Sequence, residues 1–106
     1  VQPAKSPVLT GGTPAGHGIQ GIGANFIPGI YDKDVVDEVL DMDEETAYAA
    51  ARELGKKAGL LVGMSSGGNF AAAKIIAKKL GKGKKVVTVL PDTGERYLST
   101  ILFAEE

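Results

Sequence analysis

The chain has 106 residues, 43% of them hydrophobic, and a net charge of −1. Its length fits one small domain or a part of a larger one, and its composition indicates a folded, soluble chain. It has no cysteine and one histidine, His17, which excludes disulfides, thiolate metal sites and multi-histidine metal sites. The balanced charge gives no reason to expect a nucleic acid or a membrane as partner, and no apolar run reaches the length of a membrane span. We therefore expect a cytoplasmic protein.

Residues 1–33 form a segment rich in glycine and proline, without sustained periodicity. Six of the 15 glycines lie within residues 11–23. Glycine at this density indicates a loop, a close backbone approach to a ligand, or flexibility. A loop of this length is unusual inside a compact domain, so we expect further sequence to pack over it.

Residues 34–106 show the alternation of strands and helices that predicts a parallel α/β sheet. Asp43 is expected to cap the first helix and Gly59 to end it, and Gly81 is expected to end the second. In chain order, we predict a strand at Glu38–Met42, a helix at Glu44–Ala58, a strand at Leu60–Met64, a helix at Gly67–Leu80 and a strand at Val86–Leu90. The three strands are predicted to lie side by side.

Ligands of parallel sheets bind at the carboxyl ends of the strands, which here carry the turns Ser65–Gly68 and Pro91–Gly94. The first turn is typical of an anion site at a helix N-terminus, although a simple serine cap explains it as well. His17 could act as a general base or have a structural role. Asp92 and Glu95 could be paired carboxylates or parts of a solvated turn.

Four stretches, in order, resemble a known family. Residues 6–12, 17–28, 61–68 and 91–100 are similar to the family's S-P-V-L-S-G-G, H-K-I-Q-G-I-G-A-G-F-I-P, L-V-G-I-S-S-G-A and P-[SD]-[ST]-G-E-R-Y-L-S-T. This is the cysteine synthase family, also called O-acetylserine sulfhydrylase, of fold-type-II pyridoxal-phosphate enzymes. The resemblance implies the parallel α/β architecture of the tryptophan synthase β-like enzymes, with residues 1–106 as the C-terminal part of the larger domain and 1–33 as its loop-rich active-site segment.

The resemblance also implies an activity and its cofactor. The family forms cysteine from O-acetylserine and sulfide by β-elimination and β-addition on pyridoxal 5′-phosphate. Ser65 matches the serine that binds the pyridine nitrogen of the cofactor, and Ser66 is expected to serve the turn and the helix cap. Gly21 matches a backbone position near the substrate side. Pro91 and Asp92 are expected to line the pyridine end of the pocket.

The departures from the family pattern bear on activity and partners. The Schiff-base lysine of the family lies in an S-x-K-x-R stretch that is absent from this sequence, so no catalytic residue is assigned within the chain and the isolated chain is expected to be inactive. Gly18 replaces a lysine in the loop that the family uses near serine acetyltransferase. The family implies a homodimer when full length. A part of a cystathionine β-synthase and a non-catalytic module that keeps only the cofactor end are the alternatives.

Overall fold

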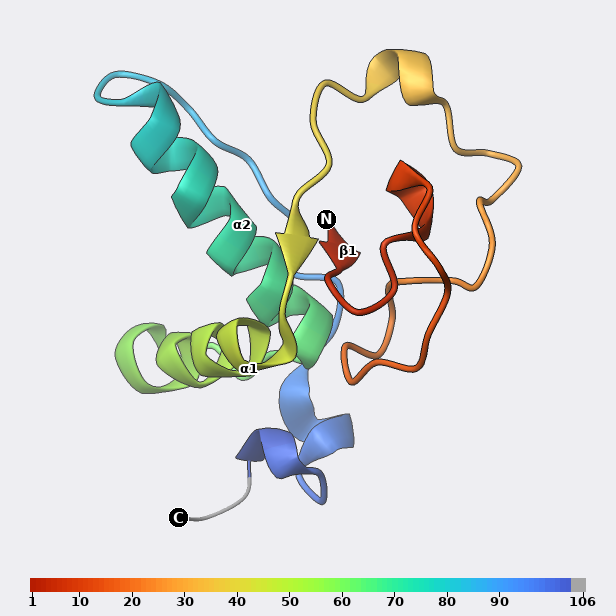
Figure 1. Cartoon of the computed structure of the whole chain (residues 1–106). Helices are drawn as coiled ribbons and strands as arrows, with labels where there is room; N and C mark the ends of the chain where they lie inside the picture. Colours follow the sequence, from red (N-terminus) through yellow and green to blue (C-terminus); the bar gives the residue numbers. More distant parts are fainter. Residues whose placement is uncertain (104–106) are drawn as a thin grey trace.

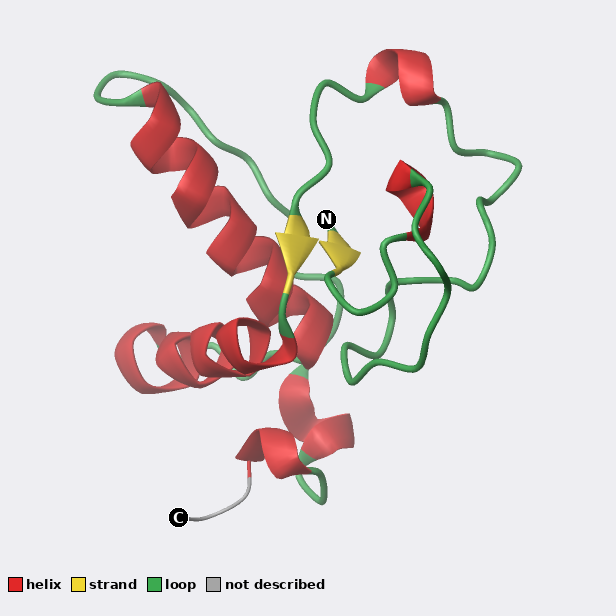
Figure 2. Ribbon diagram, viewed as in Figure 1, coloured by secondary structure: helices red, strands yellow, loops and turns green. Residues whose placement is uncertain are grey.

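A computed structural model describes residues 1–103 of the chain. Two helices, α1 (Glu44–Glu53) and α2 (Met64–Leu80), pack against each other at one side, and the N-terminal segment lies at the other side (Figure 1). Most of the first forty residues are loop (Figure 2). The last three residues of the predicted unit 34–106 lie outside the described residues. Among the described helices, none is long and apolar enough to cross a bilayer.

Helix α1 begins where the sequence predicts. Asp43 is its N-cap, and the carboxylate accepts hydrogen bonds from the Thr46 N–H at 2.9 Å and from Thr46 Oγ1 at 2.7 Å. The helix continues as a π-helical turn over Leu54–Ala58, and Gly59 ends it with a left-handed φ of 70°. The prediction of a helix over residues 44–58 is therefore confirmed.

Helix α2 begins three residues earlier than predicted. Its N-cap is Gly63, with extended backbone and no side-chain cap, so the prediction that Ser65 or Ser66 caps the helix is wrong. Low helix propensity of serine and glycine argues for a later start, but packing against α1 overrides it. A Cβ atom at Gly67 would lie 2.8 Å from Ala51 N, which shows how closely the first turns of α2 approach α1.

Of the predicted sheet, the described residues form only one pair of short parallel strands. Strand β1 (Gln2–Pro3), which the sequence does not predict, pairs in parallel with β2 (Asp41–Met42), the last two residues of the predicted first strand. The Gln2 amide also ties the pair together, since Nε2 donates to Asp41 Oδ1 at 2.7 Å. The α/β class is confirmed, but the predicted length of the first strand is wrong.

The second and third predicted strands are also wrong. Within residues 1–103, Val62 makes only an isolated antiparallel bridge with Thr93, and residues 86–90 form no strand. A strand needs hydrogen-bonding neighbours, and Val87 and Val89 are 91% and 66% exposed. Among the described residues the apolar run at 86–90 therefore has no strand to pair with, although Asn69 of α2 donates to the Val89 carbonyl at 3.0 Å.

The hydrophobic core lies between α1, α2 and the N-terminal loop. Ile19 from the loop is fully buried, as is Leu102 near the end of the described chain. On α1 the buried face consists of Ala47, Tyr48, Ala50 and Ala51. The loop of residues 16–23 is thereby held against the beginning of both helices.

Candidate functional site

The first turn of α2 carries two buried serines with different partners. Ser65 and Ser66 are 3% and 0% exposed. The Ser66 hydroxyl donates to Asp92 Oδ1 at 2.9 Å. Ser65 Oγ makes no hydrogen bond to any residue of 1–103, although it sits at the helix end where backbone N–H groups lack intrahelical partners. No buried side-chain oxygen or nitrogen of residues 1–103 lacks a partner, so the unpaired Ser65 hydroxyl reaches accessible surface, where an external group can bind it.

The carboxylate of Asp92 joins the turn after residue 90 to the start of α2. One oxygen accepts from Ser66, and the other accepts from Tyr97 Oη at 2.6 Å. The hydrogen bond to Asp92, with burial, raises the pKa of Tyr97 above its usual value. A Cβ atom at Gly63 would lie 2.5 Å from both carboxylate oxygens, so this arrangement requires glycine there.

The structure does not bring Asp92 and Glu95 together. Asp92 is bound to Ser66 and Tyr97, and Glu95 is exposed on the 3-10 turn Gly94–Tyr97. Pro91 is exposed immediately before Asp92. The alternative of a carboxylate pair is therefore wrong, and the role of Asp92 is to connect Ser66 with Tyr97.

Gly21 lies against Ser65. Its φ is +105°, a conformation that favours glycine, and a Cβ atom on it would lie 3.2 Å from Ser65 Oγ. The two site residues that the resemblance singled out are thus neighbours in space. The free Ser65 hydroxyl faces a stretch of backbone without a side chain.

Helix α1 holds the loop that carries Gly21. The Gly18 N–H donates to Glu44 Oε1 at 2.6 Å, and Tyr48 Oη donates to the Gly18 carbonyl at 2.6 Å. The hydrogen bond from Gly18 lowers the pKa of Glu44, and Lys5, at 3.2 Å from Glu44 Oε1, lowers it further. Sequence reasoning missed Glu44 and Tyr48 as parts of the site, because their partner Gly18 lies far away in the chain. It also missed Tyr97, although its partner Asp92 lies only five residues earlier.

His17 has a structural role in the same loop. Its Nδ1 accepts from the Ile19 N–H at 3.2 Å, and its Nε2 lies 3.1 Å from the Gly23 carbonyl. Both ring nitrogens are therefore occupied within the loop.

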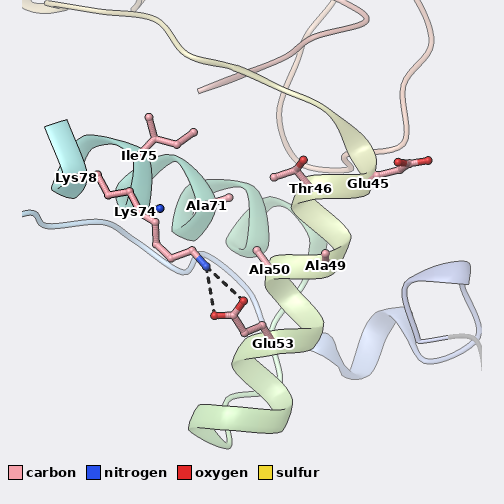
Figure 3. Close-up of a pocket in the computed structure, with 9 residues that line it drawn as sticks. All are labelled: Glu45, Thr46, Ala49, Ala50, Glu53, Ala71, Lys74, Ile75 and Lys78. Carbon is pink, nitrogen blue, oxygen red and sulfur yellow. Dashed lines mark hydrogen bonds and ion pairs between the residues drawn. The ribbon is translucent and has the colours of Figure 1, made fainter.

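A groove away from Ser65 lies between α1 and α2 (Figure 3). It has a volume of about 510 Å³ and an alanine floor, and Glu53 and Lys74 pair across it at 3.2 Å. It contains none of the site residues expected from the sequence. We place the candidate site at Ser65, because its accessible hydroxyl has no partner within residues 1–103 and is free to bind, whereas the groove offers only an exposed ion pair.

Comparison with known proteins assigns the class. Residues 1–92, which is most of the chain, match the family described as "Pyridoxal-phosphate dependent enzyme", and the chain belongs to this family.

Individual similar proteins show which members of this family the chain resembles. A cysteine synthase of Staphylococcus aureus (strain Mu50 / ATCC 700699) is 49% identical over 104 residues, which cover 98% of this chain and 34% of that protein. The crystal structure of a cysteine synthase from Entamoeba histolytica superposes with a TM-score of 0.91 at 44% identity, over 99% of this chain and 32% of that one. An O-acetylserine dependent cystathionine beta-synthase from Helicobacter pylori gives a TM-score of 0.90 at 41% identity, over 97% of this chain and 33% of that one. The chain thus spans about a third of the length of these relatives.

The residues present fit the cofactor of the family. Pyridoxal phosphate offers a pyridine nitrogen, which a hydroxyl can bind without adding charge. Ser65 supplies an accessible hydroxyl that is free of partners within residues 1–103, and Gly21 leaves the space beside it without a side chain.

Proposed function

We propose that this chain forms the pyridine end of the cofactor site in a cysteine synthase, which makes cysteine from O-acetylserine and sulfide. The observation that carries the proposal is Ser65, a residue only 3% exposed at the start of α2, whose hydroxyl is accessible and lacks a partner in residues 1–103. The similarity to cysteine synthases supports the choice of substrates.

Ser65 has a specific electrostatic task in this proposal. When bound, pyridoxal phosphate supplies electron withdrawal from the amino-acid substrate. Ser65 donates its proton to the pyridine nitrogen as a neutral hydrogen bond, and the positive end of α2 disfavours a proton on that nitrogen. A neutral ring withdraws electrons less strongly, which suits elimination and addition at the β carbon.

The other residues orient Ser65 and leave space. Ser66 and Asp92 tie the first turn of α2 to the turn at Pro91, and Tyr97 holds the second carboxylate oxygen of Asp92. We propose Asp92 as a positioning residue and not as a direct ligand, because both of its oxygens are already bound. Gly21 leaves the approach to the site without a side chain, and Pro91 lies at its edge.

A second candidate function uses the same site with another acceptor. The similarity to the Helicobacter pylori cystathionine beta-synthase supports it, and residues 65 and 92 do not distinguish the two. Activity of the complete enzyme with homocysteine in place of sulfide separates them. A non-catalytic module that keeps only the cofactor end is the third possibility, and upstream coding sequence with an S-x-K-x-R stretch would exclude it.

The wider setting follows from the family resemblance. We propose that the complete enzyme is a cytoplasmic homodimer with serine acetyltransferase as its partner. Gly18 removes the lysine that family members carry at this position in the partner loop, so we expect weaker association with that partner than in a variant carrying Gly18→Lys.

The proposed site can be tested on the chain itself. Pyridoxine 5′-phosphate has the pyridine ring but no aldehyde, so it cannot react with surface lysines. We expect millimolar pyridoxine 5′-phosphate to shift the NMR amide signals of Ser65 and Gly21, whereas benzyl phosphate, which lacks the ring nitrogen, leaves them in place.

Two serine variants complete this test. Ser65→Ala removes the ligand-induced shifts and leaves the fold intact, at a cost on the order of 1 kcal/mol in ligand binding. Ser66→Ala retains the shifts but lowers the free energy of unfolding, because Asp92 loses a buried partner. Shifts confined to Lys74 and Lys78, or equal shifts from both ligands, would contradict the proposed site.

A further inference from the structure

The loop that carries Gly21 is fixed by two side chains of α1, which bind the two successive peptide units on either side of the Gly18 Cα. Glu44 accepts from the Gly18 N–H and Tyr48 donates to the Gly18 carbonyl, each at 2.6 Å. The first bond is charge-assisted, and Tyr48 is 7% exposed, which protects the second bond from water. Position 18 therefore has little freedom to move relative to α1.

Gly18 is matched to this pair of side chains. A Cβ atom at position 18 would lie 2.7 Å from Tyr48 Oη and 2.9 Å from the Glu44 carboxyl carbon. Both distances are shorter than a carbon atom tolerates, so a larger residue must push one of the two side chains away. The lysine that the family carries at this position would have the same effect here.

The fixed peptide determines where Gly21 lies. Between positions 18 and 21 the chain is held by the fully buried side chain of Ile19, and His17 bonds to Ile19 and Gly23 on either side. The segment is short and anchored at both ends. A displacement at Gly18 is therefore transmitted to Gly21, whose Cβ position lies 3.2 Å from Ser65 Oγ.

We infer that Glu44 and Tyr48 are positioning residues that hold the Gly18 peptide and thereby set the spacing between Gly21 and Ser65. The importance of this spacing for a cofactor rests on the proposed function. The spacing itself is a property of the protein without ligand, so it can be tested independently of pyridoxine 5′-phosphate binding.

The test compares single variants of the 106-residue chain by NMR, without ligand. Tyr48→Phe is expected to raise the amide exchange rate of Gly18, whose N–H is bound to Glu44, about tenfold, as for the loss of one buried hydrogen bond. The nuclear Overhauser effect between the α protons of Gly21 and the β protons of Ser65 should weaken, while those between α1 and α2 persist. Tyr31→Phe is the control, because Tyr31 contacts neither Gly18 nor Ser65.

The Glu44 variants distinguish positioning from general stability. Glu44→Ala should produce the same selective changes, whereas Glu44→Gln keeps an acceptor oxygen and should restore the Gly21–Ser65 signal. Glu45→Gln, on the exposed side of the same turn, should change nothing. The inference is overturned if Gly21 and Ser65 keep their signal in Tyr48→Phe and Glu44→Ala, or if exchange rises equally throughout the chain.

Discussion

At the scale of single residues, the site depends on which side-chain hydroxyls are bound within the protein and which are free. Ser66 and Ser65 are adjacent, yet Ser66 is bound to Asp92 whereas the accessible Ser65 Oγ has no partner within residues 1–103. Helix geometry explains the difference, since neighbouring positions point about 100° apart around the axis. Ser66 therefore stabilises the fold, whereas the Ser65 hydroxyl remains free to bind a ligand.

Glu44 makes stability depend on pH in the acid range. Its pKa is lowered from 4.5 by the Gly18 N–H and by Lys5, with His17 also facing it. A carboxylate whose folded pKa is lowered stabilises the protein above its unfolded pKa and loses this contribution as pH falls through the folded value. We expect Glu44→Gln to cost on the order of 1 kcal/mol at neutral pH, and the difference from the unmodified chain to shrink between about pH 5 and pH 3.

The measurement is chemical unfolding at a series of pH values. Glu45→Gln serves as the matched control, because Glu45 is exposed in the same helical turn and forms no ion pair with residues 1–103. Its curve should follow that of the unmodified chain. A constant difference between Glu44→Gln and the unmodified chain at all pH values would show that the charge of Glu44 contributes nothing.

At the scale of elements, the close approach of α1 and α2 defines where α2 begins. Gly67 and Gly68 are adjacent in the second helix but differ in the space around them. A Cβ atom at Gly67 would lie 2.8 Å from both Ala51 N and Ala51 Cβ, whereas one at Gly68 would lie 3.5 Å from Met42 Cγ, an ordinary contact. The two positions offer a matched test of helix packing.

We predict opposite effects for alanine at these two positions. Gly67→Ala should lower the free energy of unfolding by about 1–3 kcal/mol, because α1 and α2 must move apart. Gly68→Ala should leave it unchanged or raise it by up to about 1 kcal/mol, because alanine favours the helix. Thermal and urea unfolding of both variants measure the difference. Equal effects would mean that α1 and α2 are not in tight contact at Gly67.

The elements that could be predicted are those with local signals. Asp43 and Gly59 act within one helical turn, so the bounds of the first helix follow from the sequence. The start of α2 depends on Ala51, and the pairing of Gln2 with Asp41 depends on residues far apart, so neither has a local signal. The apolar run at residues 86–90 reads as a strand, but a strand forms only beside another strand.

The residues of the site, like the elements, could not be predicted where they depend on contacts between distant parts of the chain. Ser65 and Gly21 follow from the resemblance to a family, whereas their mutual contact does not, because it depends on the path of the loop. Glu44 reads as an ordinary acidic residue of a first helical turn, and Tyr48 as one apolar position of a helix face. Only the structure shows that both bind the Gly18 peptide.

At the scale of the whole molecule, the described chain exposes large apolar side chains. Phe26, Ile30 and Val87 are among the exposed large side chains. The chain also covers only about a third of its relatives. The sequence contains no S-x-K-x-R stretch for the family's Schiff-base lysine. The proposed site can therefore contact the cofactor on one side, but it has no lysine of that stretch to bind it covalently.

We therefore expect the purified 106-residue chain to make no cysteine beyond the background of free cofactor. The assay supplies pyridoxal phosphate, O-acetylserine and sulfide, and the product is measured over time with and without the chain. The physical reason is that the family's chemistry starts with covalent attachment of the cofactor to a lysine whose position this sequence does not contain. Ser65→Ala, purified in the same way, controls for contaminating enzyme, because contamination gives equal rates in both preparations. A rate above background that Ser65→Ala abolishes would show that the chain is catalytic by itself, and that one of its other lysines does the work.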